Sequence, residues 1–214
     1  MVRSRVAASL FGIVLYPGVE PIDLGATYGV LSMARRVLPG VRAITLAAMA
    51  DDVVLAGGVR VSVDCVLEEA PEMDVAIVAG GAGWPQAAAD PAMLCFLRRR
   101  RAPIMASVCT GAMVLHAAGL LEGRPATTRR VALGGESAAP LDRLPNGRVA
   151  ALVDDGDLVT GGGVSLAADT TLHLLGRVYG PAAAAEVARA IEYDRALAAN
   201  HAALGTIVLE PVAA

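Results

Sequence analysis

Short apolar segments that alternate with alanine-rich helical patterns constrain the fold of this 214-residue sequence more than any other feature. Strands buried on both faces of a parallel sheet read as continuous apolar runs, and helices connect them. We therefore expect an α/β fold, a flavodoxin-like sandwich with a mostly parallel sheet and helices on both faces. The expected strands are Phe11–Tyr16, Ala43–Ala48, Val75–Ala79 and Ile104–Val108. The expected helices are Ala26–Val37, Pro91–Arg100, Thr110–Ala118, Ser165–Val178 and Ala182–Arg195.

Turn residues between further apolar segments predict two β-hairpins. One joins Val53–Ala56 to Val59–Val63 through a two-residue turn, Gly57-Gly58, and the other joins Val149–Val153 to Leu158–Thr160. The sequence shows no repeat, low-complexity linker or change of composition. We expect a single domain over residues 1–214, with its core at about 10–195.

Composition and charge limit the partners and the compartment. Hydrophobic residues make up 55% of the chain, and the net charge of −3 offers no attraction to nucleic acid or acidic membranes. The one basic run, Arg98–Arg101, follows a helical pattern and is expected to complement the carbonyl end of that helix. The number of cysteines, three, is odd, and none of them forms a CxxC pair, which favours a reducing compartment.

The first eighteen residues, MVRSRVAASLFGIVLYPG, have the apolar stretch of a signal peptide. This stretch runs directly into Tyr16-Pro17-Gly18 without an A-x-A cleavage signal, so we expect a buried first strand instead. No apolar run reaches the length of a membrane-spanning helix. The expected location is the cytoplasm.

Cys109 lies between an apolar strand pattern and a helix of small residues, in the stretch MASVCTGAMVLHAAGLL. A strand that turns sharply into a helix presents the intervening residue at the carboxyl edge of the sheet, where open α/β folds place their sites. Ser107, Gly111 and Ala112 leave room for such a turn. A helix N-terminus also favours the thiolate. We therefore expect Cys109 to be a nucleophile, and Cys65 and Cys95 to be structural.

Two other segments contain candidate site residues. Gly80 and Gly81 end an apolar strand, and backbone amides there form either an oxyanion hole or an ordinary tight turn. Asp23 lies just before a helical pattern, where it acts either as an N-cap or as a site residue.

The chain resembles the ThiJ/PfpI superfamily, the class I glutamine-amidotransferase-like fold, and within it the isonitrile hydratase branch. The resemblance covers about residues 10–195. It is carried by Tyr16–Leu24, Ala79-Gly80-Gly81, Ser107–Ala112, Ala118–Arg124 with Ala126-Thr127-Thr128, and Leu158–Gly163. Sensing domains of AraC-type regulators have similar stretches.

The resemblance implies roles for individual residues. Cys109 matches the nucleophile and Asp23 its acidic partner, while Gly80, Gly81 and Thr110 match the substrate-binding segments. Two segments depart from the pattern: Arg129-Arg130 replaces the usual His-Trp, and Gly25-Ala26-Thr27 replaces Thr-Gly-Pro. Both changes are expected to reshape the pocket mouth.

The implied activity is a cofactor-independent lyase that hydrates an isocyanide to an N-substituted formamide through a thioimidate on Cys109. Thr110 stands where PfpI-type peptidases have histidine, and His116, His173 and His201 are expected to be surface or packing residues, which disfavours a protease. The alternatives are a glyoxalase III or deglycase-like enzyme acting on α-oxoaldehydes and a stand-alone ligand or redox sensor. We expect no metal or organic cofactor, a small-molecule substrate and, from the resemblance, a homodimer.

Overall fold

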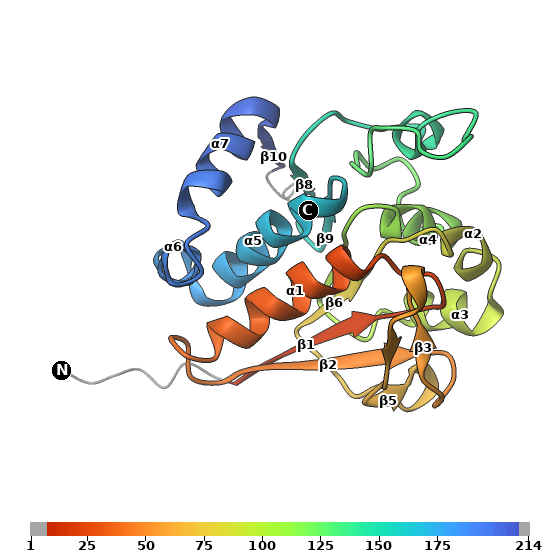
Figure 1. Cartoon of the computed structure of the whole chain (residues 1–214), viewed down its shortest axis with the longest axis horizontal. Helices are drawn as coiled ribbons and strands as arrows, with labels where there is room; N and C mark the ends of the chain where they lie inside the picture. The colour runs from red at the N-terminus through yellow and green to blue at the C-terminus, as the bar shows by residue number, and fades with distance from the viewer. Residues whose placement is uncertain (1–7, 210–214) are drawn as a thin grey trace.

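An eight-stranded sheet forms the centre of the computed structural model, which describes residues 8–209 (Figure 1). The strand order is β10-β8-β9-β7-β6-β1-β2-β5, and all neighbours are parallel except the β8–β9 pair. The strands are β1 (Ser9–Val14), β2 (Val41–Ala47), β5 (Cys65–Val66), β6 (Val75–Val78), β7 (Ile104–Ser107), β8 (Leu152–Asp154), β9 (Leu158–Gly161) and β10 (Thr206–Val208). A separate hairpin joins β3 (Val53–Val54) to β4 (Arg60–Val61).

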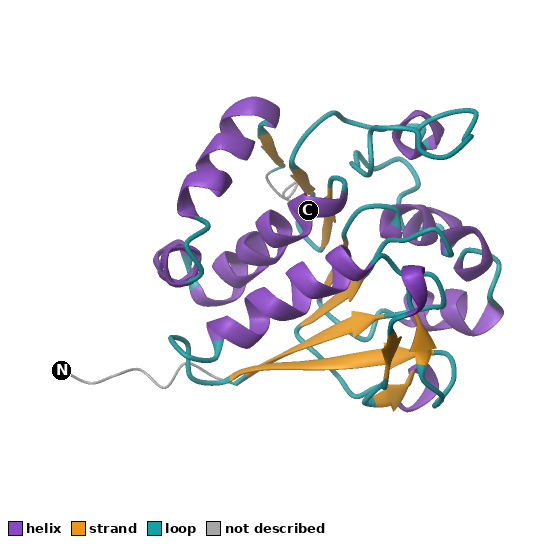
Figure 2. Cartoon of the chain, in the orientation of Figure 1, coloured by secondary structure: helices purple, strands orange, loops and turns teal. Residues whose placement is uncertain are grey.

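Helices cover both faces of this sheet (Figure 2). α1 and α5 pack side by side, whereas α4 packs with α2 and α3 and contacts β6 and β7. The helices are α1 (Pro21–Ala34), α2 (Trp84–Ala87), α3 (Pro91–Arg99), α4 (Gly111–Ala117), α5 (Ala167–Tyr179), α6 (Pro181–Ala190) and α7 (Asp194–Leu204). Short 3-10 turns are η1 (Ala56–Gly58), η2 (Leu67–Glu69), η3 (Pro140–Arg143) and η4 (Val164–Leu166).

The predicted α/β sandwich is confirmed, because its central strands are buried on both faces. Every residue of β6 is fully buried, and Phe11 and Ile13 of β1 are also inaccessible. An aliphatic run of this kind is stable only where side chains from both layers cover it. The four predicted strands therefore coincide with β1, β2, β6 and β7 within a few residues.

Several element boundaries differ from the prediction. The expected helix 182–195 is two helices, because Glu192 adopts a positive φ of 56° between α6 and α7. The first hairpin is confirmed, but its loop is longer than two residues, since Leu55 N–H bonds to Val59 O at 2.8 Å around η1. The short strands β5 and β10 were not predicted.

α1 begins earlier than predicted, at Pro21, and packs one of its faces within its own chain. Val30 and Ala34 pack in the core of the same chain. Its outer side carries Ile22, which is 55% exposed, together with Gly25 and Gly29, where an added Cβ would meet no atom within 4 Å. The open face of α1 is therefore formed by Ile22, Gly25 and Gly29.

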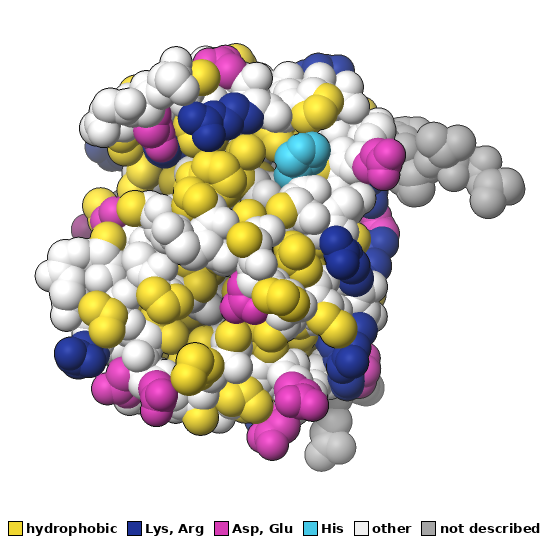
Figure 3. Space-filling model, turned by 90° about the vertical axis from the view of Figure 1, so that its right-hand side faces the viewer, with side chains coloured by type: hydrophobic (Ala, Val, Ile, Leu, Met, Phe, Trp, Pro, Cys, Tyr) yellow, Lys and Arg dark blue, Asp and Glu magenta, His cyan; other side chains and the backbone are white. Residues whose placement is uncertain are grey.

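The basic run at the end of α3 is involved in surface contacts, as expected for a helix end. Arg98 Nε donates to the Ala118 carbonyl at 3.2 Å, and Arg101 lies 3.7 Å from Glu72. Figure 3 shows the face that lies at the right in Figure 1: apolar side chains spread over its middle, and most charged side chains lie toward its margins. In the described part of the chain, no helix is long and apolar enough to cross a membrane.

Candidate active site

Cys109 occupies the turn between β7 and α4, as predicted, with a left-handed backbone φ of 50°. A non-glycine residue in this region costs on the order of 1–3 kcal/mol, so neighbouring contacts must hold it there. Two hydrogen bonds do so. The Cys109 N–H donates to Gly162 O at 3.0 Å, and Thr128 Oγ1 donates to Cys109 O at 2.6 Å.

The elbow leaves no room for a side chain at Gly111. A Cβ at Gly111 would lie 2.2 Å from the Val78 carbonyl oxygen, a backbone atom of the adjacent strand. This close approach lets α4 begin immediately above β6 and β7, and it keeps the Cys109 side chain at the carboxyl edge of the sheet.

Asp23 lies in the first turn of α1 and is fully buried. The N-cap position belongs to Glu20, and Pro21 starts the helix, so the N-cap alternative for Asp23 is wrong. Asp23 Oδ2 accepts a hydrogen bond from the Gly80 N–H at 3.0 Å. The second oxygen, Oδ1, is buried and has no hydrogen-bond partner among residues 8–209.

Gly80 brings the two reactive groups together. A Cβ added there would lie 2.6 Å from Asp23 Oδ2 and 2.7 Å from the Cys109 Cβ. Only a glycine fits between them, and the Cys109 thiol is close enough to donate to the Asp23 carboxyl. Two residues from α1 and from the β7–α4 turn thus face each other across the end of β6.

Burial dominates the electrostatics of this pair. It raises the pKa of the Asp23 carboxyl to about 7, against the opposing effect of the Gly80 hydrogen bond. Burial and then the Asp23 charge raise the pKa of the Cys109 thiol to about 11. The expected lowering of the thiol pKa at a helix N-terminus is therefore outweighed. Two like charges this close disfavour each other, so the thiolate forms most readily when Asp23 is protonated.

The backbone donors around the sulfur include Thr110, as suggested by the sequence, but Val164 takes the place of the glycines. The N–H groups of Val164 and Thr110 hydrogen-bond to the Cys109 sulfur and favour its thiolate. The Gly80 N–H is bound to Asp23, and the Gly81 N–H donates to Thr110 Oγ1 at 2.8 Å. Both glycine amides are thus engaged inside the protein, whereas the Thr110 amide faces the sulfur.

Val164 is a candidate site residue that was not predicted from the sequence. It has an unusual φ of 28° and begins η4 directly after Gly161–Gly163. The glycine run was recognised as part of the family pattern. The direction of the Val164 N–H, however, depends on the φ of Val164, which the local sequence does not determine. The sequence therefore contained the glycine run but did not show that the following N–H points at the cysteine sulfur.

A cavity of about 450 Å³ opens on Cys109. Its wall contains Thr110 and Gly81 but not Asp23, which lies behind the cysteine. The other lining residues are Glu20, Ala82, Trp84, Pro85, Arg129, Leu133, Gly134, Glu136, Arg143 and Val164. This volume suits a small molecule. Of the two segments that depart from the family pattern, Arg129 lines the cavity and Arg130 is exposed outside it, whereas Gly25, Ala26 and Thr27 do not line it.

The remaining titratable candidates lie elsewhere. His173 Nε2 lies 2.7 Å from Asp154 Oδ2, which also pairs with Arg177, and His201 lies near Asp169. These contacts join α5 and α7 to the fold rather than serving the cavity. Among the described residues, no three His, Cys, Asp or Glu side chains are grouped to hold a metal ion.

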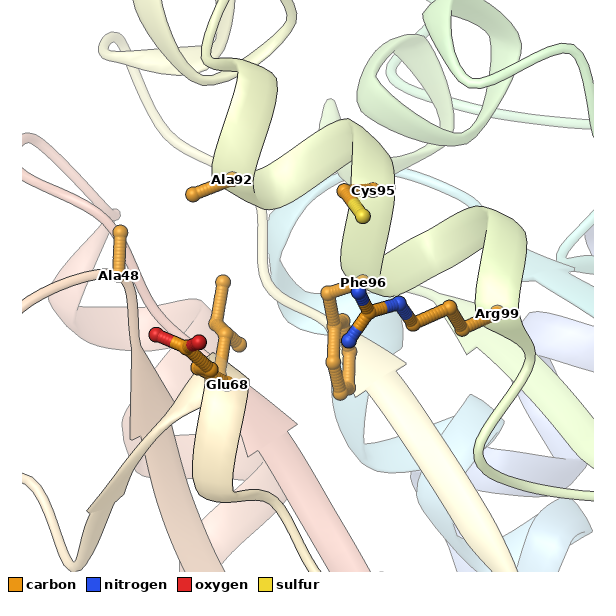
Figure 4. A pocket seen from close by; sticks show the side chains of 7 residues that line it. Ala48, Glu68, Ala92, Cys95, Phe96 and Arg99 are labelled. Carbon is orange, nitrogen blue, oxygen red and sulfur yellow. The ribbon is translucent and has the colours of Figure 1, made fainter.

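The other two cysteines also lie outside the site. Cys65 belongs to the edge strand β5. Cys95 is exposed on α3 and lines a separate surface hollow with Glu68 and Arg99 (Figure 4). Neither contacts the pair formed by Cys109 and Asp23.

Comparison with known proteins fits this geometry. Residues 11–176 match the DJ-1/PfpI family. The chain belongs to this family. It is 35% identical over 188 residues to an isonitrile hydratase from Pseudomonas putida, covering 85% of this chain and 77% of that protein. It is 29% identical to the transcriptional regulator CdhR from Pseudomonas aeruginosa, over 83% of this chain but 53% of the regulator.

A solved structure of a ThiJ/PfpI family protein from Pseudomonas syringae superposes with a TM-score of 0.74. It is 28% identical in sequence, and the match covers 88% of this chain and 76% of that one. The flavodoxin-like sheet and its arrangement of helices are therefore those of the DJ-1/PfpI fold.

Proposed function

We propose that this member of the DJ-1/PfpI family is a cysteine-dependent lyase that hydrates an isocyanide to an N-substituted formamide. The observation that carries the proposal is the buried pair of Cys109 and Asp23, which face each other across Gly80 beside a small cavity. The similarity to an isonitrile hydratase supports the choice of substrate class.

The pair can supply a nucleophile and one proton. The Cys109 thiolate adds to the terminal carbon of R–NC while the Asp23 carboxylic acid protonates that carbon, which gives an S-bound thioformimidate. The N–H groups of Val164 and Thr110 hold the sulfur during this attack.

Water completes the reaction. Asp23, now a carboxylate, takes a proton from a water molecule as its oxygen adds to the thioformimidate carbon. The hydroxyl proton of this adduct moves to nitrogen as the carbon–sulfur bond breaks, releasing R–NH–CHO. Cys109 leaves as thiolate and Asp23 is again protonated, so the pair returns to its starting state.

The test is turnover of an aromatic isocyanide, with the formamide identified by mass spectrometry. We expect formamide from the wild type, none from Cys109→Ser, and full activity from Cys95→Ser, whose exposed thiol lies outside the cavity. Incubation with methylglyoxal tests the alternative: formation of lactate in place of formamide would assign a glyoxalase-like activity.

A second function is a ligand sensor, because a transcriptional regulator is among the relatives of this chain. A sensor binds without consuming its ligand. Thermal stabilisation by an isocyanide or an α-oxoaldehyde, without product from either, would favour the sensor over the lyase.

We also propose a homodimer whose subunits meet through the open face of α1. Small residues at Gly25 and Gly29 allow close approach of a second backbone, and the exposed Ile22 gives this face an apolar contact. All three cysteines are free, which supports a reducing compartment such as the cytoplasm.

A further inference from the structure

One wall of the cavity that opens on the nucleophile contains a buried cation. Arg129 is 8% exposed, unusual for an arginine, and it lines the same cavity as Cys109. Its stem packs on Gly163, where an added Cβ would lie 3.2 Å from Arg129 Cγ. Gly163 directly precedes Val164, whose N–H binds the Cys109 sulfur, so the arginine is fixed close to the reacting atom.

The protein holds the Arg129 guanidinium in place but does not use all of its hydrogen-bond donors. Its Nη2 donates to Glu136 Oε1 at 2.6 Å, and its Nη1 donates to the Val131 carbonyl. Within residues 8–209, no hydrogen bond is formed from its Nε. A guanidinium has five N–H donors in a planar fork suited to a carboxylate, so donors remain for a bound anion.

A second arginine strengthens this wall. Arg143 lines the cavity, and its charge adds to the hydrogen bonds from Arg129 and the Leu133 N–H in lowering the pKa of the Glu136 carboxyl. The group formed by Arg129, Glu136 and Arg143 therefore has one positive charge in excess. Glu20 also lines the cavity, and its charge acts on Asp23, as that of Arg129 does, whereas the charge of Arg129 acts on Cys109 as well.

We propose that Arg129, assisted by Arg143 at the rim, binds a carboxylate of the substrate, so that the preferred electrophile is a small anion rather than a neutral molecule. This deepens the proposed function by naming its substrate class. It depends on that function only in taking Cys109 as the nucleophile.

Alkylation of Cys109 tests the proposal without requiring turnover. The probes are iodoacetate and iodoacetamide, together with the longer pair 3-bromopropionate and 3-bromopropionamide. The rate on the Cys109 peptide is followed by mass spectrometry, and each acid-to-amide ratio is divided by the same ratio for N-acetylcysteine. Both reagents of a pair react with one thiolate, so any change in its population cancels from the ratio.

We expect a normalised ratio of about ten for at least one pair in the wild type, the size of a charge-assisted contact. Arg129→Gln should lower it to about one, and Arg143→Gln should lower it partly. Glu136→Gln should raise it, because Arg129 then loses its competing carboxylate. Arg130→Gln removes the same charge from an exposed neighbour outside the cavity and should leave the ratio unchanged.

A wild-type ratio near one for both pairs overturns the proposal, as does an unchanged ratio in a folded Arg129→Gln protein. If this variant does not fold, the wild-type ratio and Arg143→Gln decide by the same criteria. Isocyanoacetate and its methyl ester distinguish the proposed hydratase activity from the proposed anion site at Arg129. Turnover of neither of these nor of the aromatic isocyanide, with a high alkylation ratio, would refute the hydratase and retain the anion site. Turnover of the ester but not of the acid, with a ratio near one, would do the reverse.

Discussion

Asp23 and Cys109 meet across a single glycine: a Cβ at Gly80 would lie 2.6 Å from the aspartate Oδ2 and 2.7 Å from the cysteine Cβ. The contact joins the first turn of α1 to the β7–α4 elbow over the end of β6.

Gly80→Ala should separate the pair. The added methyl group overlaps both side chains and the Thr110 backbone nitrogen, so we expect a loss of about 1–3 kcal/mol of stability and of most of the turnover. Urea denaturation and the isocyanide assay measure these effects. Gly176→Ala is the matched control, since its Cβ would make only an ordinary contact of 3.4 Å with Ala184. Wild-type turnover in Gly80→Ala would show that the close approach is not needed.

Gly111→Val should disrupt the elbow itself. Its Cβ would collide with the Val78 carbonyl oxygen, a backbone atom that cannot rotate away. We expect a large fall in the free energy of unfolding, by roughly 3 kcal/mol or more, or no folded protein. Circular dichroism and thermal melting report this directly. Full stability and activity would contradict the elbow geometry.

Asp23→Asn should separate ionisation of the thiol from turnover. Removing the carboxylate abolishes the repulsion that helps to raise the pKa of Cys109, so iodoacetamide should alkylate the variant at least as fast as the wild type at pH 8. Formamide production should stop because the proton donor is absent. Slower alkylation together with retained turnover would exclude Asp23 as the acid.

The stability of the protein should depend on pH through Asp23. Its folded pKa of about 7 exceeds the ordinary value of 3.8, so the folded state binds more protons between these limits. The free energy of unfolding therefore loses a contribution as pH rises from about 4 to 7. Urea titrations at pH 5 and pH 8 should show a smaller difference for Asp23→Asn than for the wild type. An equal difference in both proteins would contradict the raised pKa.

Light scattering at micromolar concentration tests the proposed dimer. The expected mass is twice the 21.8 kDa of the chain. Gly29→Arg places a bulky charge on the open face of α1, where an added Cβ meets nothing in its own subunit, and should give monomers that remain folded. A wild-type mass near 21.8 kDa at all concentrations would refute the dimer.

The central fold could be predicted because long aliphatic runs in the sequence indicate strands that are buried on both faces. The aliphatic runs of β1, β2, β6 and β7 have no stable alternative to the middle of a sheet. The short edge strands β5 and β10 have no such signature. The break between α6 and α7 was missed because alanine-rich sequence continues on both sides of the positive φ at Glu192.

The residues of the candidate site could be predicted from the sequence, but their pKa values and their hydrogen-bond partners could not. Cys109 and its small neighbours suggested the elbow, but the balance between the helix N-terminus and burial depends on three-dimensional packing. The engagement of the Gly81 amide by Thr110 and the N–H of Val164 at the sulfur likewise depend on segments that meet only in the fold.

The contacts that hold Cys109 in its left-handed conformation come from residues synthesised after it. Thr128 and Gly162, which bind its backbone, lie farther along the chain, and so does Val164, whose N–H binds the sulfur. Gly162 and Val164 belong to the segment that follows β9. A nascent chain that has emerged from the ribosome only as far as the elbow therefore lacks the residues that fix the conformation of Cys109. The nucleophile is assembled late in translation, when the sheet that will enclose it is already nearly complete.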